Sequence, residues 1–120
     1  MKANPRAAIA YIAGAIISGK RASSVYDYSR GGYINIGGNI SGSSVGVYDY
    51  DQGCHISGNR SGDRFSLYHY GDSHHIDLTI KGRNFKGYDY GSSSHYSGTV
   101  NGNSITLYDY GEGEYFNYST

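Results

Sequence analysis

The chain has 120 residues, with 10 Lys and Arg against 10 Asp and Glu, 19 glycines, 15 tyrosines and one proline. This length suits a single domain with one modest hydrophobic core. The balanced charge gives no electrostatic basis for binding nucleic acid. Abundant glycine and tyrosine favour strands joined by tight turns over helices. The single cysteine, Cys54, cannot form an intrachain disulfide and therefore says nothing about the redox compartment.

The first element in the chain is an apolar stretch, residues 6–18, in which alanine and isoleucine dominate. Pro5 suits the first turn of a helix and Gly19 suits its end, so the stretch is predicted to be helical. Such a helix is about 18 Å long, which is too short to span a bilayer. Apolar residues lie nearly all round it, and a helix of this kind requires burial on every face. We therefore expect residues 1–22 to carry a hydrophobic helix enclosed by a β domain of residues 23–120.

Two other interpretations of this helix remain open. Lys2 and Arg6 ahead of an apolar run resemble a signal peptide, although no small-residue cleavage site follows before Lys20. Basic residues flank the run at both ends, which suits a helix lying on a membrane surface, so residues 6–18 are candidates for peripheral membrane contact. A cytoplasmic location is favoured, with membrane-associated and secreted locations as alternatives.

A tyrosine signature, Tyr-Asp-Tyr with His in place of Asp in the third copy, recurs along the remainder of the chain. Its five copies start at Tyr26, Tyr48, Tyr68, Tyr88 and Tyr108, which are 22 residues apart once and then 20 residues apart three times. A fixed period of this size indicates one supersecondary unit used repeatedly. Mostly apolar residues recur one and three positions before the signature, and again eight and ten positions after its first tyrosine. Because side chains alternate along a strand, each repeat is predicted to hold two strands with one apolar face each.

Short glycine-containing loops separate these strands. Gly42, Gly62, Gly82 and Gly102 occupy one register between repeats, and Asn101-Gly102 is typical of a type I′ hairpin turn. Short loops at both ends of every strand allow only antiparallel neighbours. The prediction is an all-β protein with about ten short antiparallel strands in a meander of 20-residue repeats.

Two open edges would remain in such a meander. Pairing the strands near residues 24–28 and 114–118 removes both edges and closes the sheet into a shallow, flower-like barrel plugged by the N-terminal helix. A β-solenoid is the alternative, because the period alone does not distinguish stacked coils from hairpins.

The repeated unit of strand, Tyr-Asp, glycine-rich turn and strand resembles the four-fold beta-flower family over residues 24–120. That fold is compared with the tubby C-terminal domain, in which a barrel surrounds a hydrophobic helix. The resemblance implies a tubby-like, helix-plugged short β-barrel, although tubby-like domains carry the helix after the barrel and here it precedes the repeats. It also implies phosphoinositide binding, for which this sequence has no matching basic cluster.

The signature tyrosines are the candidate binding residues, because they lie on the strand face opposite the aliphatic one. They are Tyr26, Tyr28, Tyr48, Tyr50, Tyr68, Tyr70, Tyr88, Tyr90, Tyr108 and Tyr110. Stacked across neighbouring strands they form an aromatic belt, and exposed aromatic surface of that extent marks a site of binding or self-association. The alternative is that the rings pack against one another.

The central residues of the signatures are expected at strand ends on the apolar side, where they cap turns by accepting backbone N–H bonds. They are Asp27, Asp49, His69, Asp89 and Asp109. A ring of acids that binds a cation at one barrel mouth is the alternative.

Three further histidines, His55, His75 and His95, share one column and are the outside candidates for a zinc or copper site, because imidazole is a common ligand of both metals. In a barrel with its apolar face inside they point outward and lie roughly 9–10 Å apart, beyond the reach of a single metal ion. His74-His75 is a local doublet and makes no stronger motif. The sequence therefore predicts no metal site and no cofactor.

No nucleophile–base pairing, phosphate-binding loop or metal motif is present in the sequence. We therefore expect a binding module, not an enzyme, that meets an unknown protein, lipid or membrane surface through its tyrosine-rich outer wall or apolar interior. A structural protein that assembles from copies of itself, as a homo-oligomer, is the alternative. A carbohydrate-binding module with tyrosine platforms is a third, and no nucleic-acid partner is expected.

Overall fold

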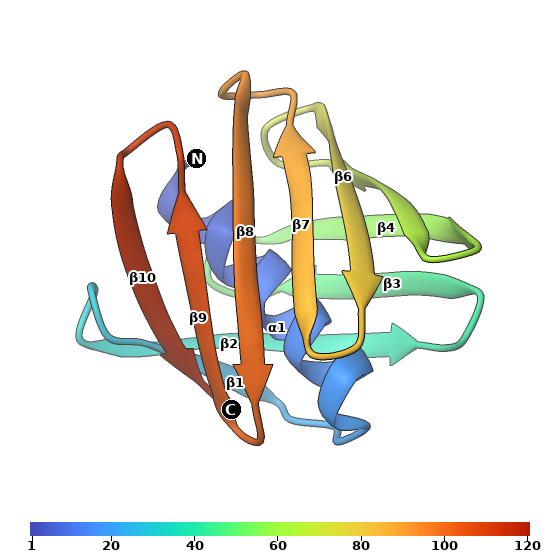
Figure 1. Cartoon of the computed structure of the whole chain (residues 1–120), viewed down its shortest axis with the longest axis horizontal. Helices are drawn as coiled ribbons and strands as arrows, with labels where there is room; N and C mark the ends of the chain where they lie inside the picture. Colours follow the sequence, from blue (N-terminus) through green and yellow to red (C-terminus); the bar gives the residue numbers. More distant parts are fainter.

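The computed structural model describes all 120 residues as one α-helix and ten strands (Figure 1). The helix is α1 (Ala3–Ser18), and the strands are β1 (Ser24–Asp27), β2 (Gly32–Ile40), β3 (Ser44–Asp49), β4 (Cys54–Ser61), β5 (Arg64–His69), β6 (His74–Lys81), β7 (Asn84–Asp89), β8 (Ser94–Asn101), β9 (Ser104–Asp109) and β10 (Glu114–Ser119). Each strand pairs antiparallel with its neighbours in sequence, and β1 also pairs with β10, so the sheet closes. The predicted helix-plugged antiparallel barrel is confirmed, and the β-solenoid is not supported.

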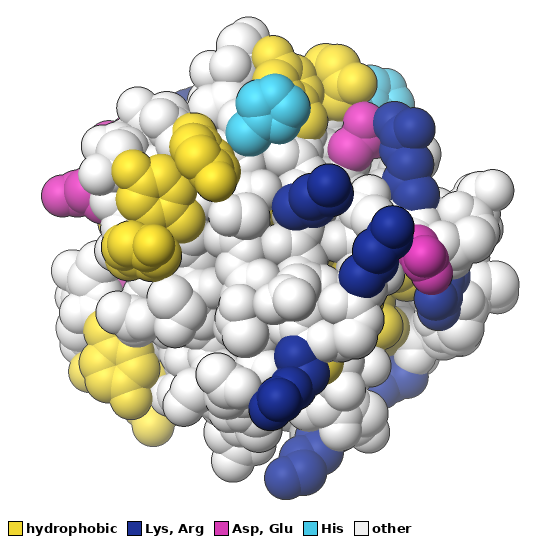
Figure 2. Space-filling view, viewed as in Figure 1, with side chains coloured by type: hydrophobic (Ala, Val, Ile, Leu, Met, Phe, Trp, Pro, Cys, Tyr) yellow, Lys and Arg dark blue, Asp and Glu magenta, His cyan; other side chains and the backbone are white.

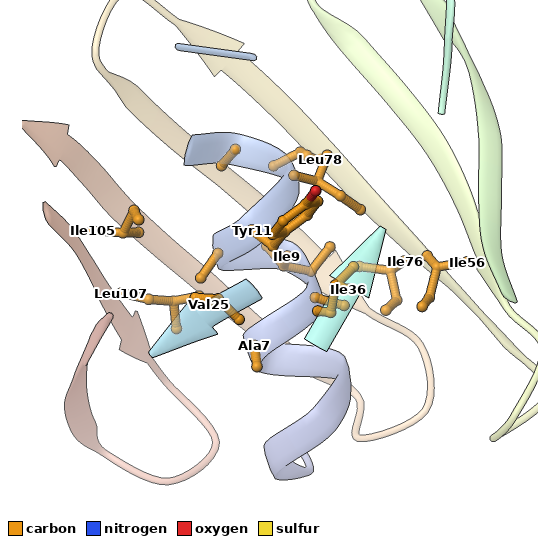
Figure 3. Close-up of a cluster of buried hydrophobic side chains, with 14 of the residues drawn as sticks. Ala7, Ile9, Tyr11, Val25, Ile36, Ile56, Ile76, Leu78, Ile105 and Leu107 are labelled. Carbon is orange, nitrogen blue, oxygen red and sulfur yellow. The ribbon is translucent and has the colours of Figure 1, made fainter. Parts of the chain in front are cut away.

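Helix α1 runs through the middle of the barrel (Figure 1) and forms the centre of its core. It begins at Ala3, earlier than the predicted residue 6, and ends at Ser18, after which Gly19 adopts a left-handed conformation with φ 71°. Every residue from Pro5 to Gly14 is buried. Aliphatic side chains from strands all round the barrel cover it (Figure 3), including Val25, Ile36, Ile56, Ile76, Leu78, Ile105 and Leu107. No helix of the structure combines the length and the apolar character needed to cross a membrane.

The barrel wall follows the predicted alternation, except where glycines face aromatic rings. Tyr96 occupies a position that holds isoleucine in three other repeats, and Gly87 lies opposite it on the paired strand β7. A Cβ atom on Gly87 would lie 2.4 Å from the Tyr96 hydroxyl, which donates a 2.7 Å hydrogen bond to the Asp77 carbonyl. The missing side chain of Gly87 therefore makes the room that the larger ring requires.

The hairpin between β8 and β9 differs from the predicted turn type. Asn101 pairs with Ser104, so the two-residue loop is Gly102-Asn103, and Asn101 belongs to the strand. Gly102 has φ 59°, whereas Asn103 has no positive φ. A glycine with positive φ in the first loop position is the type II′ arrangement. The type I′ prediction was therefore wrong, because the loop begins one residue later than predicted, at Gly102.

The two ends of the barrel are built differently and are named here for that reason. The signature end carries the five loops that follow the tyrosine signatures, residues 28–31, 50–53, 70–73, 90–93 and 110–113, together with the start of α1. The hairpin end carries the tips around Gly42, Gly62, Gly82 and Gly102, together with the end of α1, where the Arg21 guanidinium donates to the Ile40 carbonyl.

Candidate functional site

The central residues of the five signatures form a buried ring at the signature end, and each is at most 1% exposed. Each side chain accepts an N–H from the loop that follows it. Oδ1 of Asp49, for example, accepts the amides of Asp51 and Gln52 at 2.8 and 3.0 Å. His69 performs the same task in the third repeat, because its Nδ1 accepts the amide of Asp72 at 3.0 Å. These residues therefore cap their turns, as the sequence predicted.

Part of the negative charge of the ring is compensated by the start of α1, which lies in the barrel mouth. Oδ2 of Asp109 lies 2.9 Å from the amino group of Met1 and 3.2 Å from Nη1 of Arg6. The Arg6 guanidinium also stacks 3.5 Å from the centre of the Phe116 ring. Asp49 accepts a 2.9 Å hydrogen bond from the amide of Asn4. Groups of α1 thus bind the carboxylates of Asp109 and Asp49, whereas Oδ2 of Asp27 is buried without a hydrogen-bond partner.

Each signature also builds one aromatic cluster on the outer wall, called a tyrosine cluster below. The two signature tyrosines contact each other, and the first contacts an aromatic residue of the next strand: Tyr33, His55, His75, His95 or Tyr115. Ring centres lie 4.7–4.9 Å apart at 65–78°, which is the favoured edge-to-face arrangement.

The rings pack against one another and still face solvent. The second tyrosine of every signature is 54–65% exposed: Tyr28, Tyr50, Tyr70, Tyr90 and Tyr110. Tyr33 and Tyr115 are exposed to 70% and 69%. Figure 2 shows such aromatic groups standing out from the surface, separated from one another by polar wall. The structure therefore places the candidate tyrosines in five separate clusters and not in one continuous belt.

The histidines of the shared column stay apart. His55, His75 and His95 are exposed, and each lies edge-on to the first tyrosine of its own cluster. They act as parts of the aromatic clusters, and the fold brings no two of them together.

Sequence reasoning missed a polar cluster at the signature end, where the repeats differ most. Six positions after the first tyrosine stand Gly32, Cys54, His74, Ser94 and Glu114, each paired with the ring residue of its own repeat. This column places Sγ of Cys54 3.8 Å from Nε2 of His69, and the His74 ring parallel to the His69 ring. Two features of the sequence indicated this cluster. His69 replaces the aspartate of the other four signatures, and the residue six positions after the first tyrosine differs in every repeat.

The thiol and imidazole of this cluster are not poised for nucleophilic catalysis. Burial raises the pKa of the Cys54 thiol, with only partial offset by the amide of Gly71. Burial likewise lowers the pKa of His69, which therefore stays neutral around pH 7. A protonated thiol beside a neutral imidazole lacks the thiolate that attacks a substrate.

A shallow groove crosses the outer wall over β6 to β9. Its two adjoining parts have volumes of about 720 and 620 Å³ and share Thr79, Lys86, Ser97 and Tyr110. Tyrosines of two clusters stand at its edge, among them Tyr88 and Tyr110. The groove therefore lies between two of the five tyrosine clusters.

Charged side chains are distributed unequally between the two ends. Seven exposed basic residues lie near the hairpin tips or just after α1: Lys20, Arg21, Arg60, Arg64, Lys81, Arg83 and Lys86. Figure 2 shows Lys and Arg gathered towards the centre, right and bottom of the view, away from most of the aromatic groups. The sequence, with its zero net charge, contains no basic run, and only the closed barrel brings these residues to one end.

Comparison with known proteins found no matching family model, no matching curated protein and no matching solved structure.

Proposed function

We propose that this protein is a non-enzymatic binding module that recognises a protein partner through its tyrosine clusters. The observation that carries the proposal is the exposure of more than half of the side-chain surface in seven clustered tyrosines. Tyrosine is enriched where proteins bind one another, because it offers a large apolar face and a hydroxyl with few rotatable bonds. The closed barrel around a hydrophobic helix also supports our proposal that the chain is related to the four-fold beta-flower and tubby-like proteins.

The packing of each cluster favours binding. Every exposed signature tyrosine lies edge-to-face against a neighbour that is itself held between two rings. Its side chain has therefore lost part of its freedom before a partner arrives, and immobilising a free side chain at an interface costs about 0.5–1.5 kcal/mol. Repetition around the wall provides several equivalent contact points.

A photo-reactive amino acid in place of an exposed tyrosine tests this proposal. We expect Tyr70 and Tyr110 replacements to give discrete adducts with another protein in the native cell. A replacement of Asn103, which is exposed at the hairpin end, is the matched control and should give none of them. The absence of adducts from the tyrosine positions, or identical adducts from Asn103, would refute the proposal.

The same experiment distinguishes binding to another protein from assembly with a second copy of this chain. An adduct of twice 13.0 kDa that contains only this chain identifies a second copy as the partner. With the photo-reactive amino acid at position 110, replacing Tyr50, Tyr70 and Tyr90 by serine should abolish the adducts of a specific partner while leaving the far-ultraviolet circular dichroism spectrum that of a folded β protein.

A second candidate, binding to an anionic membrane surface, is favoured by the basic hairpin end. The partly buried Ile16 and Ile17 lie at this same end of α1, next to the basic residues. Each Lys or Arg near an anionic surface contributes about 1 kcal/mol. Flotation with vesicles that contain phosphatidylserine should fall on Lys81→Glu and Arg83→Glu, and Arg30→Glu at the signature end is the control. Equal flotation with purely zwitterionic vesicles would exclude this candidate.

A further inference from the structure

We propose that His69, Asp72 and His74 form a binding site for a divalent transition-metal ion, with Zn²⁺ as the best match. The three side chains lie at the signature end, around the loop 70–73, and their nearest donor atoms all fall within 4.8 Å of one another. None of the three side chains belongs to a tyrosine cluster, although Tyr70 lies in the same loop, and the site does not depend on the proposed protein binding.

The carboxylate of Asp72 provides the first argument. Oδ1 accepts a 3.0 Å hydrogen bond from the amide of Gln52 and lies 3.7 Å from Nζ of Lys2. Oδ2, in contrast, is buried and has no hydrogen-bond partner. It lies 3.9 Å from Nδ1 of His69 and 3.8 Å from Nε2 of His74, too far for a hydrogen bond to either. A buried carboxylate oxygen without a donor requires an explanation, and a bound cation between these three groups supplies one.

His74 is held in the orientation that a metal ligand needs. Its Nδ1 lies 3.1 Å from Oδ1 of Asp89 and 3.4 Å from the carbonyl oxygen of His75. Two acceptors at Nδ1 place the proton there, which leaves the lone pair of Nε2 directed to the Asp72 side. A carboxylate behind the imidazole is the usual support of a metal-binding histidine, because it fixes the tautomer and the direction of the ring.

His69 contributes the second imidazole from the buried ring. Its Nδ1 carries a lone pair, since it accepts the amide of Asp72 at 3.0 Å. A metal ion at Nδ1 would have to displace this amide, so binding requires a rearrangement of the loop 70–73. Losing one such hydrogen bond lowers the affinity by roughly tenfold, so we expect binding weaker than in a preformed zinc site.

The donor set fits a transition-metal ion. Two imidazoles and a carboxylate with one position left for water match catalytic-type zinc sites, and the same donors also bind Fe²⁺ and Cu²⁺. Tetrahedral bonds of about 2.0–2.1 Å require donor atoms roughly 3.3 Å apart. Oδ2 of Asp72 lies 3.9 and 3.8 Å from the two imidazole nitrogens, and the three donor atoms lie within 4.8 Å of one another, so binding requires the Asp72 loop and the two histidine rings to move closer together.

Metal binding is tested with untagged full-length protein, freed of metal with a chelator and titrated with ZnCl₂ by calorimetry. We expect one ion per chain, a raised melting temperature with excess Zn²⁺, and a tetrahedral visible absorption spectrum with Co²⁺. Nitrogen NMR should show shifts at the His69 and His74 side chains and none at His75. Failure to bind Zn²⁺ saturably at millimolar concentration would overturn the proposal.

Neighbouring histidines provide a matched pair of variants. His74→Ala should weaken Zn²⁺ binding by at least tenfold, whereas His75→Ala, one residue along on the outer face, should leave it unchanged. Asp72→Asn keeps the size of the side chain and should also weaken binding at least tenfold, which guards against a folding defect in the alanine variant. Equal affinity of the wild type and Asp72→Asn, or loss of binding in His75→Ala, would show that the ion binds elsewhere.

Discussion

Nη1 of Arg6 lies 3.2 Å from Oδ2 of Asp109, and both side chains are buried in the mouth of the barrel. The guanidinium also donates from Nε to the Tyr118 hydroxyl at 3.1 Å and from Nη1 to the Met1 carbonyl at 2.7 Å. The buried part of helix α1 thus carries one charged side chain, Arg6. Its partners Asp109 and Tyr118 lie together at the mouth of the barrel. We infer that this pair sets how far α1 inserts into the barrel.

Removing Arg6 should therefore destabilise the protein. Arg6→Met leaves Asp109 buried without its guanidinium, and breaking a buried pair in this way costs about 3–5 kcal/mol. Urea denaturation measures the change. Arg30→Met is the control, because its 2.9 Å bridge to Asp51 is 40% and 39% exposed and should contribute less than about 1 kcal/mol. Equal effects of the two variants would show that the buried pair has no special role.

The stability should also depend on pH through Asp109. Burial raises the pKa of Asp109. The hydrogen bond and charge of the Met1 amino group, together with the backbone amides of Glu112 and Gly111, lower this pKa by more than burial raises it, so the folded pKa lies below the usual value. A carboxyl with a depressed folded pKa stabilises the fold above its unfolded pKa of about 4. This contribution is lost as the pH falls through the folded pKa.

Asp109→Asn should accordingly be less stable than the wild type at pH 7 and should show a smaller loss between pH 5 and pH 2. Urea melts across this range give the comparison. A variant with an unchanged pH profile would assign the acid sensitivity to other carboxylates of the ring.

The close approach at Gly87 predicts a strong effect of a single methyl group. Gly87→Ala places a Cβ 1.8 Å from the Asp77 carbonyl oxygen and 2.4 Å from the Tyr96 hydroxyl, so the strands must move. We expect a loss of about 1–3 kcal/mol. In Gly46→Ala on β3 the added Cβ would have no heavy atom of a non-neighbouring residue within 4 Å. This variant should change the free energy of unfolding by less than about 0.5 kcal/mol. Similar values for both would contradict the crowding at Gly87.

Two isoleucines of α1 test its role as the core. Ile9 is fully buried, whereas Ile17 is only partly buried near the hairpin end. Ile9→Ala should cost about 2–5 kcal/mol, and Ile17→Ala clearly less. Thermal melts of both variants provide the measurement, and a larger loss at Ile17 would argue against a helix centred in the barrel.

Much of the fold follows from short-range patterns in the chain. Period-two alternation around each signature predicted two strands per repeat, and the glycine tips predicted hairpins. The all-round apolar surface of residues 6–18 predicted burial of the helix, because enclosure by the barrel removes every face from water. The turn type at Asn101 was wrong, since the end of a strand is set by pairing with Ser104 and not by the dipeptide itself.

The sequence by itself predicted the repeat, the separation of each strand into an aliphatic and a tyrosine face, and the capping role of Asp27, Asp49, Asp89 and Asp109. Each of these depends on the alternation of one strand or on the turn beside it, and both are local. Only the tertiary structure decided which residues meet across repeats: Arg6 with Asp109, Gly87 with Asp77, and Asp72 with His69 and His74. Closure of the barrel also decided the basic end, because residues 20 to 40 positions apart become neighbours only when the hairpins line up side by side.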